Sequence, residues 1–311
     1  MTSLPRHASL PHVMDDAAAR CAICDERANT AVMVRLGASR LVRCDGCGSW
    51  TYLPRLTPES QARLHDTSEY FAHPYFQHRR QSTEALRHRC QEALTRVGRG
   101  FPLRSLRGER VLDIGCDTGG FAREAAQMFG FIPIGIDVSM NAVEEATRRG
   151  MEAYHASIEG APGHLRDLAV ITAIDLIEHV VSPREFLHAV YDRLRPGGVV
   201  YLETPNIASI VYRAGRVLCR LTGARPQGMF ERLFPRQHAQ YFTRNALWAL
   251  AERCGFEVVQ IDTRLLPFRA VGTSLLVRAG VVGLQLLDVV THARRILICA
   301  VLRKPLRSRV L

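Results

Sequence analysis

The stretch RVLDIGCDTGGFAREA, residues 110–125, decides the fold that we expect for this chain. Residues 110–114 have the pattern of a buried strand, Gly115 and Gly119 mark a turn, and a helical pattern follows. Nucleotide-type cofactors bind at such turns, because the glycines let the backbone lie close to the ligand at the helix N-terminus. The stretch therefore predicts a cofactor loop.

The chain alternates between strand and helix patterns from residue 109 onward. We expect strands over residues 110–114, 131–138, 151–156, 168–175, 199–204, 256–262 and 295–305, and helices over 119–129, 139–150, 182–194 and 243–255. Ser139 and Thr243 suit the N-caps of two of these helices. Such alternation predicts an α/β fold, namely a Rossmann-like, seven-stranded parallel sheet wound on both faces.

Two aspartates stand at the ends of the first two of these strands. Ligands of doubly wound sheets bind at the carboxyl ends of the strands, which here are Asp113 and Asp137. An acid at the end of the second strand can hold ribose hydroxyls, with helix capping as the alternative role for Asp137. NAD, FAD and S-adenosylmethionine all fit these observations.

Asp117 stands where the usual spacing of the loop would place a glycine. A carboxylate there would repel the pyrophosphate that a dinucleotide places against the helix N-terminus. The same carboxylate is compatible with S-adenosylmethionine, whose sulfonium and ammonium groups are cationic. Aspartate also adopts positive φ more readily than most residues. Asp117 therefore favours the methyl donor over a dinucleotide.

Four of the nine cysteines form two CxxC pairs, CAIC at 21–24 and CDGC at 44–47, separated by 19 residues. This spacing is typical of zinc sites, and the segment between the pairs predicts a β-hairpin. We predict a structural zinc ribbon with the ligands Cys21, Cys24, Cys44 and Cys47. A redox CxxC would need a thioredoxin-like context, which the sequence lacks, and catalytic zinc would keep an open position.

The length of 311 residues suits one large α/β domain with a small module, and the formal net charge is +11. The arginines are scattered, so the charge alone does not select a partner. A signal-peptide pattern is missing, and charged residues interrupt the longest apolar segment, 279–302. We expect a cytoplasmic protein, with contact to the inner face of the membrane and a homodimer left open.

We divide the chain into a lead-in, a zinc ribbon, a helical bridge and a cofactor domain, over residues 1–18, 19–56, 57–104 and 105–311. The aromatic cluster at 70–76 in the bridge suits core packing or a lid. Two inserted covers, 207–235 and 265–292, are apolar with arginines, which suits an amphipathic, partly anionic substrate. Ordinary core packing or a dimer face is the alternative for both covers.

Several motifs together resemble a known family. VLDIGCDTGGF, GIDVS, DLIEHVVSP, LRPGG, LETPN and HAQYFT stand in the order seen in class I S-adenosylmethionine-dependent methyltransferases. Residues 105–311 most resemble the branch related to the ubiquinone-biosynthesis O-methyltransferases, and the ribbon with its bridge resembles a zinc-ribbon-bearing subgroup. Asp117 departs from the glycine that is usual in the family.

The resemblance implies a set of cofactor contacts. They are Asp113, Gly115, Cys116 and Gly119 at the methionine end, Asp137 at the ribose, Val138, Ser157 and Ile158 at the adenine, and Asp175 facing both the methionine part and the methyl acceptor. Asp117 joins the expected cofactor contacts on the charge argument given above.

Methyl transfer to a hydroxyl also requires a base, for which we consider Asp175, His179 and His238. The resemblance further implies a divalent metal held by Asp175, Glu178 and His179. Support of the loop is the alternative role for Glu178 and His179, and a carboxylate acceptor would need no base.

We therefore expect an S-adenosylmethionine-dependent methyltransferase that O-methylates a small or lipid-linked acceptor. One alternative is an RNA methyltransferase with the basic ribbon as reader, which is disfavoured because the ribbon offers only Trp50 and Tyr52 for stacking. The other is a non-catalytic, cofactor-binding regulatory protein.

Overall fold

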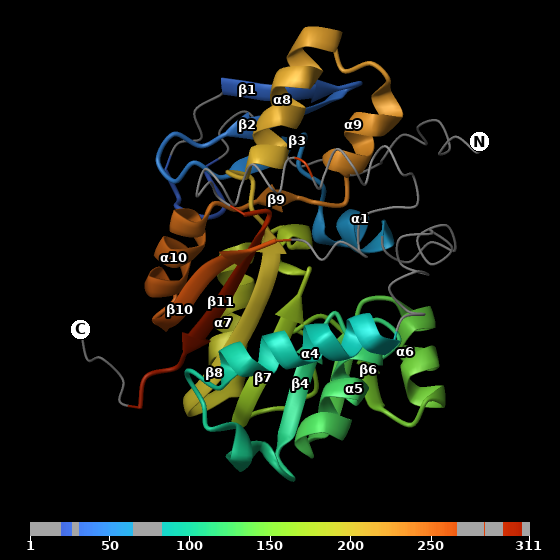
Figure 1. Cartoon of the computed structure of the whole chain (residues 1–311), viewed down its shortest axis with the longest axis vertical. Helices are drawn as coiled ribbons and strands as arrows, with labels where there is room; N and C mark the ends of the chain where they lie inside the picture. Colours follow the sequence, from blue (N-terminus) through green and yellow to red (C-terminus); the bar gives the residue numbers. More distant parts are fainter. Residues whose placement is uncertain (1–19, 27–30, 65–82, 266–282, 284–294, 307–311) are drawn as a thin grey trace.

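The computed structural model describes residues 20–26, 31–64, 83–265, 283 and 295–306 (Figure 1). These residues form a seven-stranded sheet in the order β10-β11-β8-β7-β4-β5-β6 and a four-stranded sheet in the order β1-β2-β3-β9. The expected seven-stranded α/β fold is confirmed. The lead-in at 1–18 and the aromatic cluster at 70–76 lie outside the described residues.

The large sheet follows the strand pattern of the sequence closely. Its strands are β4 (Arg110–Ile114), β5 (Ile132–Asp137), β6 (Glu152–His155), β7 (Leu168–Ile174), β8 (Leu194–Pro205), β10 (Glu257–Arg264) and β11 (Leu297–Arg303). β7, with the sequence LAVITAI, is buried over nearly its whole length. Such a continuous apolar run is typical of strands that are covered on both faces.

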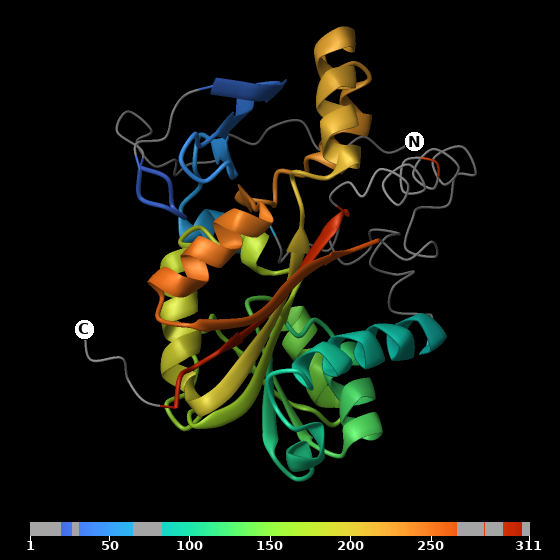
Figure 2. The same cartoon turned by 60° about the vertical axis from the view of Figure 1, so that its left-hand side comes forward.

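Helices cover both faces of this sheet (Figure 2). The helices α4 (Thr83–Val97), α5 (Gly120–Phe129) and α6 (Met140–Arg148) lie on one side, and α7 (Pro183–Arg193) and α10 (Arg244–Arg253) on the other. The side chains of Ser139 and Thr243 accept the N–H groups of Ala142 and Ala246, so both expected N-caps are confirmed. Short 3₁₀ turns occupy Leu103–Leu106 and Ile177–His179.

The direction of the last strand differs from the expectation of a wholly parallel sheet. β4, β5, β6, β7 and β8 pair in parallel, whereas β11 is antiparallel to both of its neighbours, β8 and β10. A buried apolar strand has the same sequence pattern in either direction, so hydrophobic alternation did not distinguish the two arrangements. The sheet is therefore mixed.

The four-stranded sheet joins two distant parts of the chain. The expected hairpin is present as β1 (Ala31–Leu36) and β2 (Ser39–Arg43), and β3 (Trp50–Leu53) follows. The fourth strand, β9 (Gln240–Tyr241), pairs with β3, and Thr51 Oγ1 donates to Gln240 Oε1 at 2.7 Å. The cysteine-bearing module thus completes its sheet with residues that lie almost 190 positions later.

The first expected cover, 207–235, packs on this small sheet (Figures 1 and 2). It forms α8 (Ile210–Thr222) and α9 (Gln227–Leu233), and both contact β1. Tyr212, Phe230 and Phe234 share one apolar cluster with Leu41 and Trp50. The second expected cover, 265–292, lies outside the described residues except for Leu265 and Gly283.

The bridge begins with α1 (Pro58–Arg63). In α4 an apolar stripe is buried at Cys90, Ala93, Leu94 and Val97. None of the described helices combines the length and the apolar character that crossing a membrane requires. The domain boundaries given above stay predictions.

Candidate functional site

The loop after β4 has three residues in the left-handed region of backbone conformation. Gly115, Asp117 and Gly119 have φ values of 71°, 50° and 74°. Aspartate tolerates this region better than most side chains, which explains why Asp117 can stand at this position of the loop. The N–H groups of Gly115 and Cys116 donate to the carbonyl of Ile136, at 2.8 and 3.1 Å, and thereby tie the loop to β5.

Asp137, at the end of β5, shapes this loop. Its Oδ2 accepts the backbone N–H of Asp117 and its Oδ1 accepts that of Ser139, both at 2.9 Å. Burial raises the pKa of Asp137, and these two backbone donors oppose the rise. Each carboxylate oxygen has a further lone pair, so the loop contacts are compatible with the ribose contact implied by the resemblance.

The side chain of Cys116 lies beneath the backbone of the loop. This side chain is 3% exposed and packs with Ala122, Ala146 and Met151. Burial raises the pKa of this thiol well above its ordinary value. The thiol is therefore directed into the core, and the part of Cys116 that can meet a ligand is its backbone. Sequence reasoning missed Gly135, on which the thiol packs: a Cβ there would lie 2.5 Å from Cys116 Sγ.

Asp113, at the end of β4, is 4% exposed. Thr172 Oγ1 donates to its Oδ1 at 2.6 Å, and burial raises the pKa of Asp113 to about 7. At the ends of β5 and β6, the expected adenine contacts are exposed at Ser157, half-buried at Val138 and buried at Ile158. The Val138 carbonyl lies 3.0 Å from His155 Nε2.

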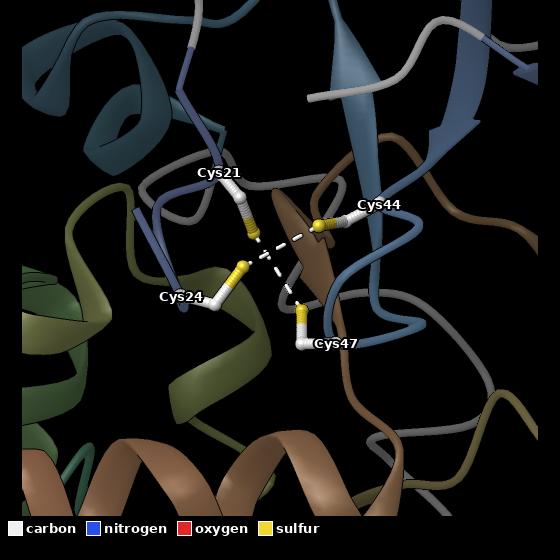
Figure 3. Close-up of side chains that lie close together, drawn as sticks. All are labelled: Cys21, Cys24, Cys44 and Cys47. Carbon is white, nitrogen blue, oxygen red and sulfur yellow. Dashed lines mark hydrogen bonds between the residues drawn. The ribbon is translucent and has the colours of Figure 1, made fainter. Parts of the chain in front are cut away.

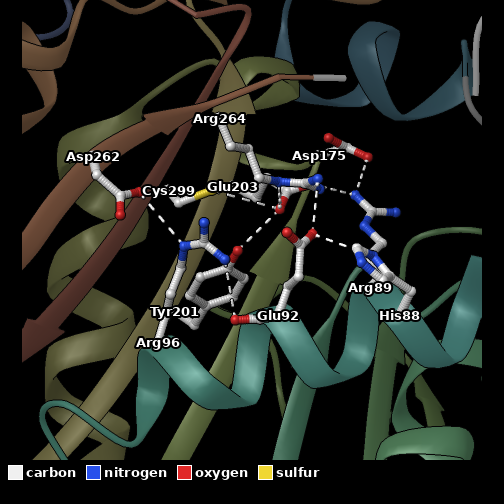
Figure 4. Close-up of polar contacts among 10 residues, drawn as sticks. All are labelled: His88, Arg89, Glu92, Arg96, Asp175, Tyr201, Glu203, Asp262, Arg264 and Cys299. Atoms are coloured by element: carbon white, nitrogen blue, oxygen red, sulfur yellow. Dashed lines mark hydrogen bonds and ion pairs between the residues drawn. The ribbon is translucent and has the colours of Figure 1, made fainter. Parts of the chain in front are cut away.

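Asp175 follows β7 and is bound to α4 (Figure 4). Arg89 Nη2 donates to Asp175 Oδ2 at 2.6 Å and to Glu203 Oε1 at 2.7 Å. The backbone of Asp175 has a φ of 53°, and its N–H donates to the Glu203 carbonyl. Asp175 is therefore linked to a helix that precedes the cofactor domain.

Glu203, in β8, is the buried centre of this network (Figure 4). Arg264 Nη2 and Tyr201 Oη donate to its two oxygens, at 2.8 and 2.9 Å. Burial opposes ionisation of Glu203, but Arg89 and Arg264 hold its pKa below the ordinary value. Sequence reasoning missed all three of these charged residues. The glutamate in the apolar strand VVYLET was the available signal, since a buried acid needs a cationic partner.

Two predicted histidines meet beside this network. The rings of His179 and His238 lie edge to face, 4.7 Å apart, and Glu178 is close enough for one ligand atom of each residue to lie within 4.8 Å of the others. His179 Nδ1 donates to the Gln237 carbonyl at 2.9 Å, which leaves Nε2 as the nitrogen that can accept a proton or bind a metal. The metal-ligand group therefore includes His238 in place of Asp175.

Within this group Glu178 is buried, whereas His179 and His238 are half-buried. Thr204 Oγ1 donates to Glu178 Oε2, and burial raises the pKa of the carboxyl well above its ordinary value. Burial also lowers the pKa of His179 to about 4, so its ring is neutral at pH 7. A neutral imidazole is a ligand that divalent transition metals accept, and Glu178 would bind such a metal as a carboxylate after losing its proton.

The four predicted zinc ligands converge (Figure 3). Cys24 Sγ lies 3.4 Å from Cys44 Sγ, Cys21 Sγ lies 3.7 Å from Cys47 Sγ, and all four lie within 4.8 Å of one another. Tetrahedral Zn–S bonds of about 2.3 Å place sulfurs about 3.8 Å apart. The cluster is therefore compatible with a tetrahedral zinc ion.

The cysteine cluster is fastened to α10. Thr243 Oγ1 donates to the Cys47 carbonyl at 3.2 Å, and Arg253 Nη1 donates to the Cys24 carbonyl. Cys21, Cys24 and Cys44 are buried in the core that contains the apolar face of α10. The cluster thus couples the small sheet to the large one.

Comparison with known families gives the class of protein. A model of the methyltransferase domain matches residues 76–261, more than half of the chain. The chain belongs to this methyltransferase domain family.

Curated relatives match over the cofactor region. The ubiquinone biosynthesis O-methyltransferase of Aromatoleum aromaticum is 36% identical over 108 residues, which are 32% of this chain and 46% of that protein. The mitochondrial ubiquinone biosynthesis O-methyltransferase of Schizosaccharomyces pombe is 31% identical over 106 residues, 31% of this chain and 38% of that protein. The chain thus matches less than half the length of these relatives.

Solved structures confirm the fold. Phosphoethanolamine N-methyltransferase 2 of Haemonchus contortus, in complex with S-adenosyl-L-methionine, matches with a TM-score of 0.55 and 18% identity, over 82% of this chain and 63% of that one. The plantazolicin methyltransferase BpumL, in complex with SAH, matches with a TM-score of 0.52 and 20% identity, over 79% and 96%. At this level of identity the likeness concerns the fold alone.

Proposed function

We propose that this chain is an S-adenosylmethionine-dependent methyltransferase that O-methylates a small or lipid-linked acceptor in a biosynthetic pathway. The observation that carries the proposal is the loop of residues 115–119, with Asp137 bound to it at the neighbouring strand end. This is the ligand position of doubly wound sheets. Membership of the methyltransferase domain family supports the same reading.

The cofactor would lie along the ends of β4, β5 and β6. Asp137 would accept hydrogen bonds from the ribose hydroxyls, and Val138 and Ile158 would flank the adenine. Asp117 would face the cationic end of the cofactor, where its carboxylate is attractive rather than repulsive. Asp175 would lie beside the methionine part, with Arg89 fixing its orientation.

In the reaction an acceptor oxygen attacks the methyl carbon, the bond from carbon to sulfur breaks, and the electron pair stays on sulfur. The acceptor proton must leave when the acceptor is a hydroxyl. His179 and His238, whose ring centroids are 4.7 Å apart, would accept that proton. The carbonyl of Gln237 fixes the tautomer of His179, so that Nε2 is the basic nitrogen.

Two metal sites belong to the proposal. Zinc bound by the four cysteines would be structural, since four thiolates complete a tetrahedral shell. A divalent cation held by Glu178, His179 and His238 would polarise the acceptor oxygen. A cytoplasmic location, contact with the inner face of the membrane and a homodimer stay predictions.

The proposal is tested by turnover. Purified protein with filled zinc sites is incubated with S-adenosylmethionine labelled in its methyl group and with hydroxylated aromatic or lipid extracts. We expect labelled methyl to appear in an acid- and base-stable ether, together with S-adenosylhomocysteine. Label in a base-labile ester would indicate a carboxylate acceptor, and binding of the cofactor without any turnover would favour the non-catalytic alternative.

A further inference from the structure

A groove of about 1250 Å³ separates the cysteine-bearing sheet from the start of α8 and the start of α10. Residues 45–48, which include Cys47 of the cysteine cluster, form one wall. Asn206 and Thr263 line it from the carboxyl ends of β8 and β10. The groove therefore opens at the same edge of the large sheet as the cofactor loop. The three bounding elements can be followed in Figures 1 and 2.

The charge of the groove is strongly positive. The lining residues that the structure describes include the four arginines Arg43, Arg213, Arg216 and Arg244 and one acid, Asp45, which lies 4.0 Å from Arg43. Four cations less one anion give a formal charge of +3. Among the residues that the structure describes, Arg213, Arg216 and Arg244 form no ion pair. The excess charge is therefore not neutralised by this part of the chain.

Arg216 shows that part of this excess positive charge is poorly solvated. Its Nε is buried and has no hydrogen-bond partner within the described ranges, and its Nη1 contacts only a weak acceptor, Met33 Sδ, at 3.4 Å. Burial, together with Arg220 and Arg213, lowers the pKa of this guanidinium. Arg216 is half-buried, so its buried Nε loses hydration without a partner in this part of the chain, whereas Arg43, Arg213 and Arg244 are exposed. A bound anion would remove that penalty.

Two helix N-termini point to the same ligand charge. Ile210 begins α8 and Arg244 begins α10, and both residues line the groove. The first N–H groups of a helix have no partner within the helix and carry a partial positive charge. Met33, Trp50 and Ile207 add apolar surface. The groove thus combines strong anion attraction with an apolar wall.

We propose that this groove binds the phosphoryl group of a phosphate- or diphosphate-bearing amphipathic molecule, and, on the basis of the methyltransferase function proposed above, that this molecule is the methyl acceptor. A charge of +3 is matched better by a phosphate dianion or a diphosphate than by one carboxylate. The planar guanidinium forms paired hydrogen bonds to phosphate oxygens, and the groove contains arginine rather than lysine.

The test is a calorimetric titration of the full, zinc-loaded chain with inorganic pyrophosphate at about 0.15 M salt, where exposed charges more than about 8 Å apart are screened. We expect saturable binding with one ligand per chain. Arg213→Gln and Arg244→Gln are each expected to weaken it at least tenfold. The control is Arg220→Gln, which makes the same charge change on α8 outside the lining and is expected to weaken binding less than threefold. Zinc content and circular dichroism before and after titration verify that every variant is folded and loaded.

Three outcomes would overturn the inference. The first is the absence of saturable pyrophosphate binding, and the second is an equal loss of pyrophosphate affinity in Arg220→Gln and Arg213→Gln. The third is binding of an RNA oligonucleotide through these arginines while pyrophosphate fails to bind. A parallel titration with S-adenosylmethionine separates this inference from the proposed function. Binding of pyrophosphate without binding of S-adenosylmethionine would support the anion site in the groove and contradict the proposed methyltransferase function. Binding of S-adenosylmethionine without binding of pyrophosphate would support the proposed function and contradict the anion site.

Discussion

Asp137 Oδ2 accepts the backbone N–H of Asp117 at 2.9 Å. The acid at the end of β5 therefore fixes the loop residue that stands where the usual spacing would place a glycine. The two aspartates have different tasks. Asp137 is largely buried and fixes the backbone, whereas Asp117 supplies a charge at a left-handed position with a φ of 50°. The departure from glycine is therefore built into the local structure.

Asp137→Asn removes the charge and one of the two acceptor oxygens. Because the amide can serve the loop or the ribose less well than the carboxylate, we expect the Kd for S-adenosylmethionine to rise at least tenfold, about 1.4 kcal/mol. Isothermal titration measures it. The matched control is Asp192→Asn, an exposed position on α7. Equal affinities for the Asp137 variant and the parent protein would show that Asp137 acts only in capping.

Asp117→Gly and Asp117→Ala separate backbone conformation from charge. Glycine adopts positive φ without strain, so Asp117→Gly should retain the stability of the parent, whereas Asp117→Ala should lose about 1 kcal/mol in chemical denaturation. Both changes should weaken cofactor binding a few fold at low salt and less at high salt, because both remove the carboxylate. Tighter cofactor binding by either variant would contradict an attractive role for Asp117.

Gly135→Ala tests the packing beneath the loop. The added Cβ would lie 2.5 Å from Cys116 Sγ and 2.6 Å from Met151 Cε, so the loop must move. We expect a loss of about 1–3 kcal/mol in the free energy of unfolding. Cys116→Ala in the same chain should restore part of that loss, because it removes one of the two clashing atoms. A double-mutant cycle measures the coupling, and additive losses would contradict the contact.

Asp113 predicts a pH dependence of stability. Its pKa is raised by burial from about 3.8 to about 7, so the folded state binds a proton more tightly than the unfolded state. This stabilising contribution is complete below about pH 4 and is lost as pH rises through 7. Asp113→Asn should therefore raise the free energy of unfolding at pH 8, on the order of 2 kcal/mol, relative to its effect at pH 4. Chemical denaturation curves at pH 4 and pH 8 measure this difference. An equal effect of the substitution at both pH values would contradict a raised pKa of the Asp113 carboxyl.

Zinc removal should affect more than the small sheet. The cysteine cluster is bonded to α10, and β3 pairs with β9 from a distant part of the chain. We expect one zinc per chain by elemental analysis, and a fall of several degrees in Tm for Cys44→Ser. Cys90→Ser, a buried cysteine of α4 away from the cluster, is the control for loss of a core thiol. Its zinc content should be unchanged, whereas loss of zinc in both variants would contradict the assignment of the ligands.

The elements that the sequence predicted are those whose signals are local. A buried apolar run, a glycine turn and an N-cap serine each act within a few residues, so β4, the loop and the start of α6 were placed almost to the residue. β9 was missed because two residues are too short to show an alternating pattern. The direction of β11 was missed because it is set by its pairing partner.

The site was predictable to the same degree. The CxxC spacing of the four cysteines was enough to predict that they share one site, and the structure brings them together. Arg89, Glu203 and Arg264 come from three separate segments, and only the fold makes them neighbours. The prediction that Asp175 joins Glu178 and His179 at a metal came from the resemblance to the methyltransferase family. The side chain of Asp175 is bonded to Arg89 instead, and His238 occupies the third position.

The most direct test of the central claim is calorimetric titration of the zinc-loaded chain with S-adenosylmethionine. We predict binding of one cofactor per chain, competition by S-adenosylhomocysteine, and no competition for this site by NAD or FAD, whose pyrophosphate would meet the carboxylate of Asp117. Absence of S-adenosylmethionine binding by protein with filled zinc sites would contradict the account.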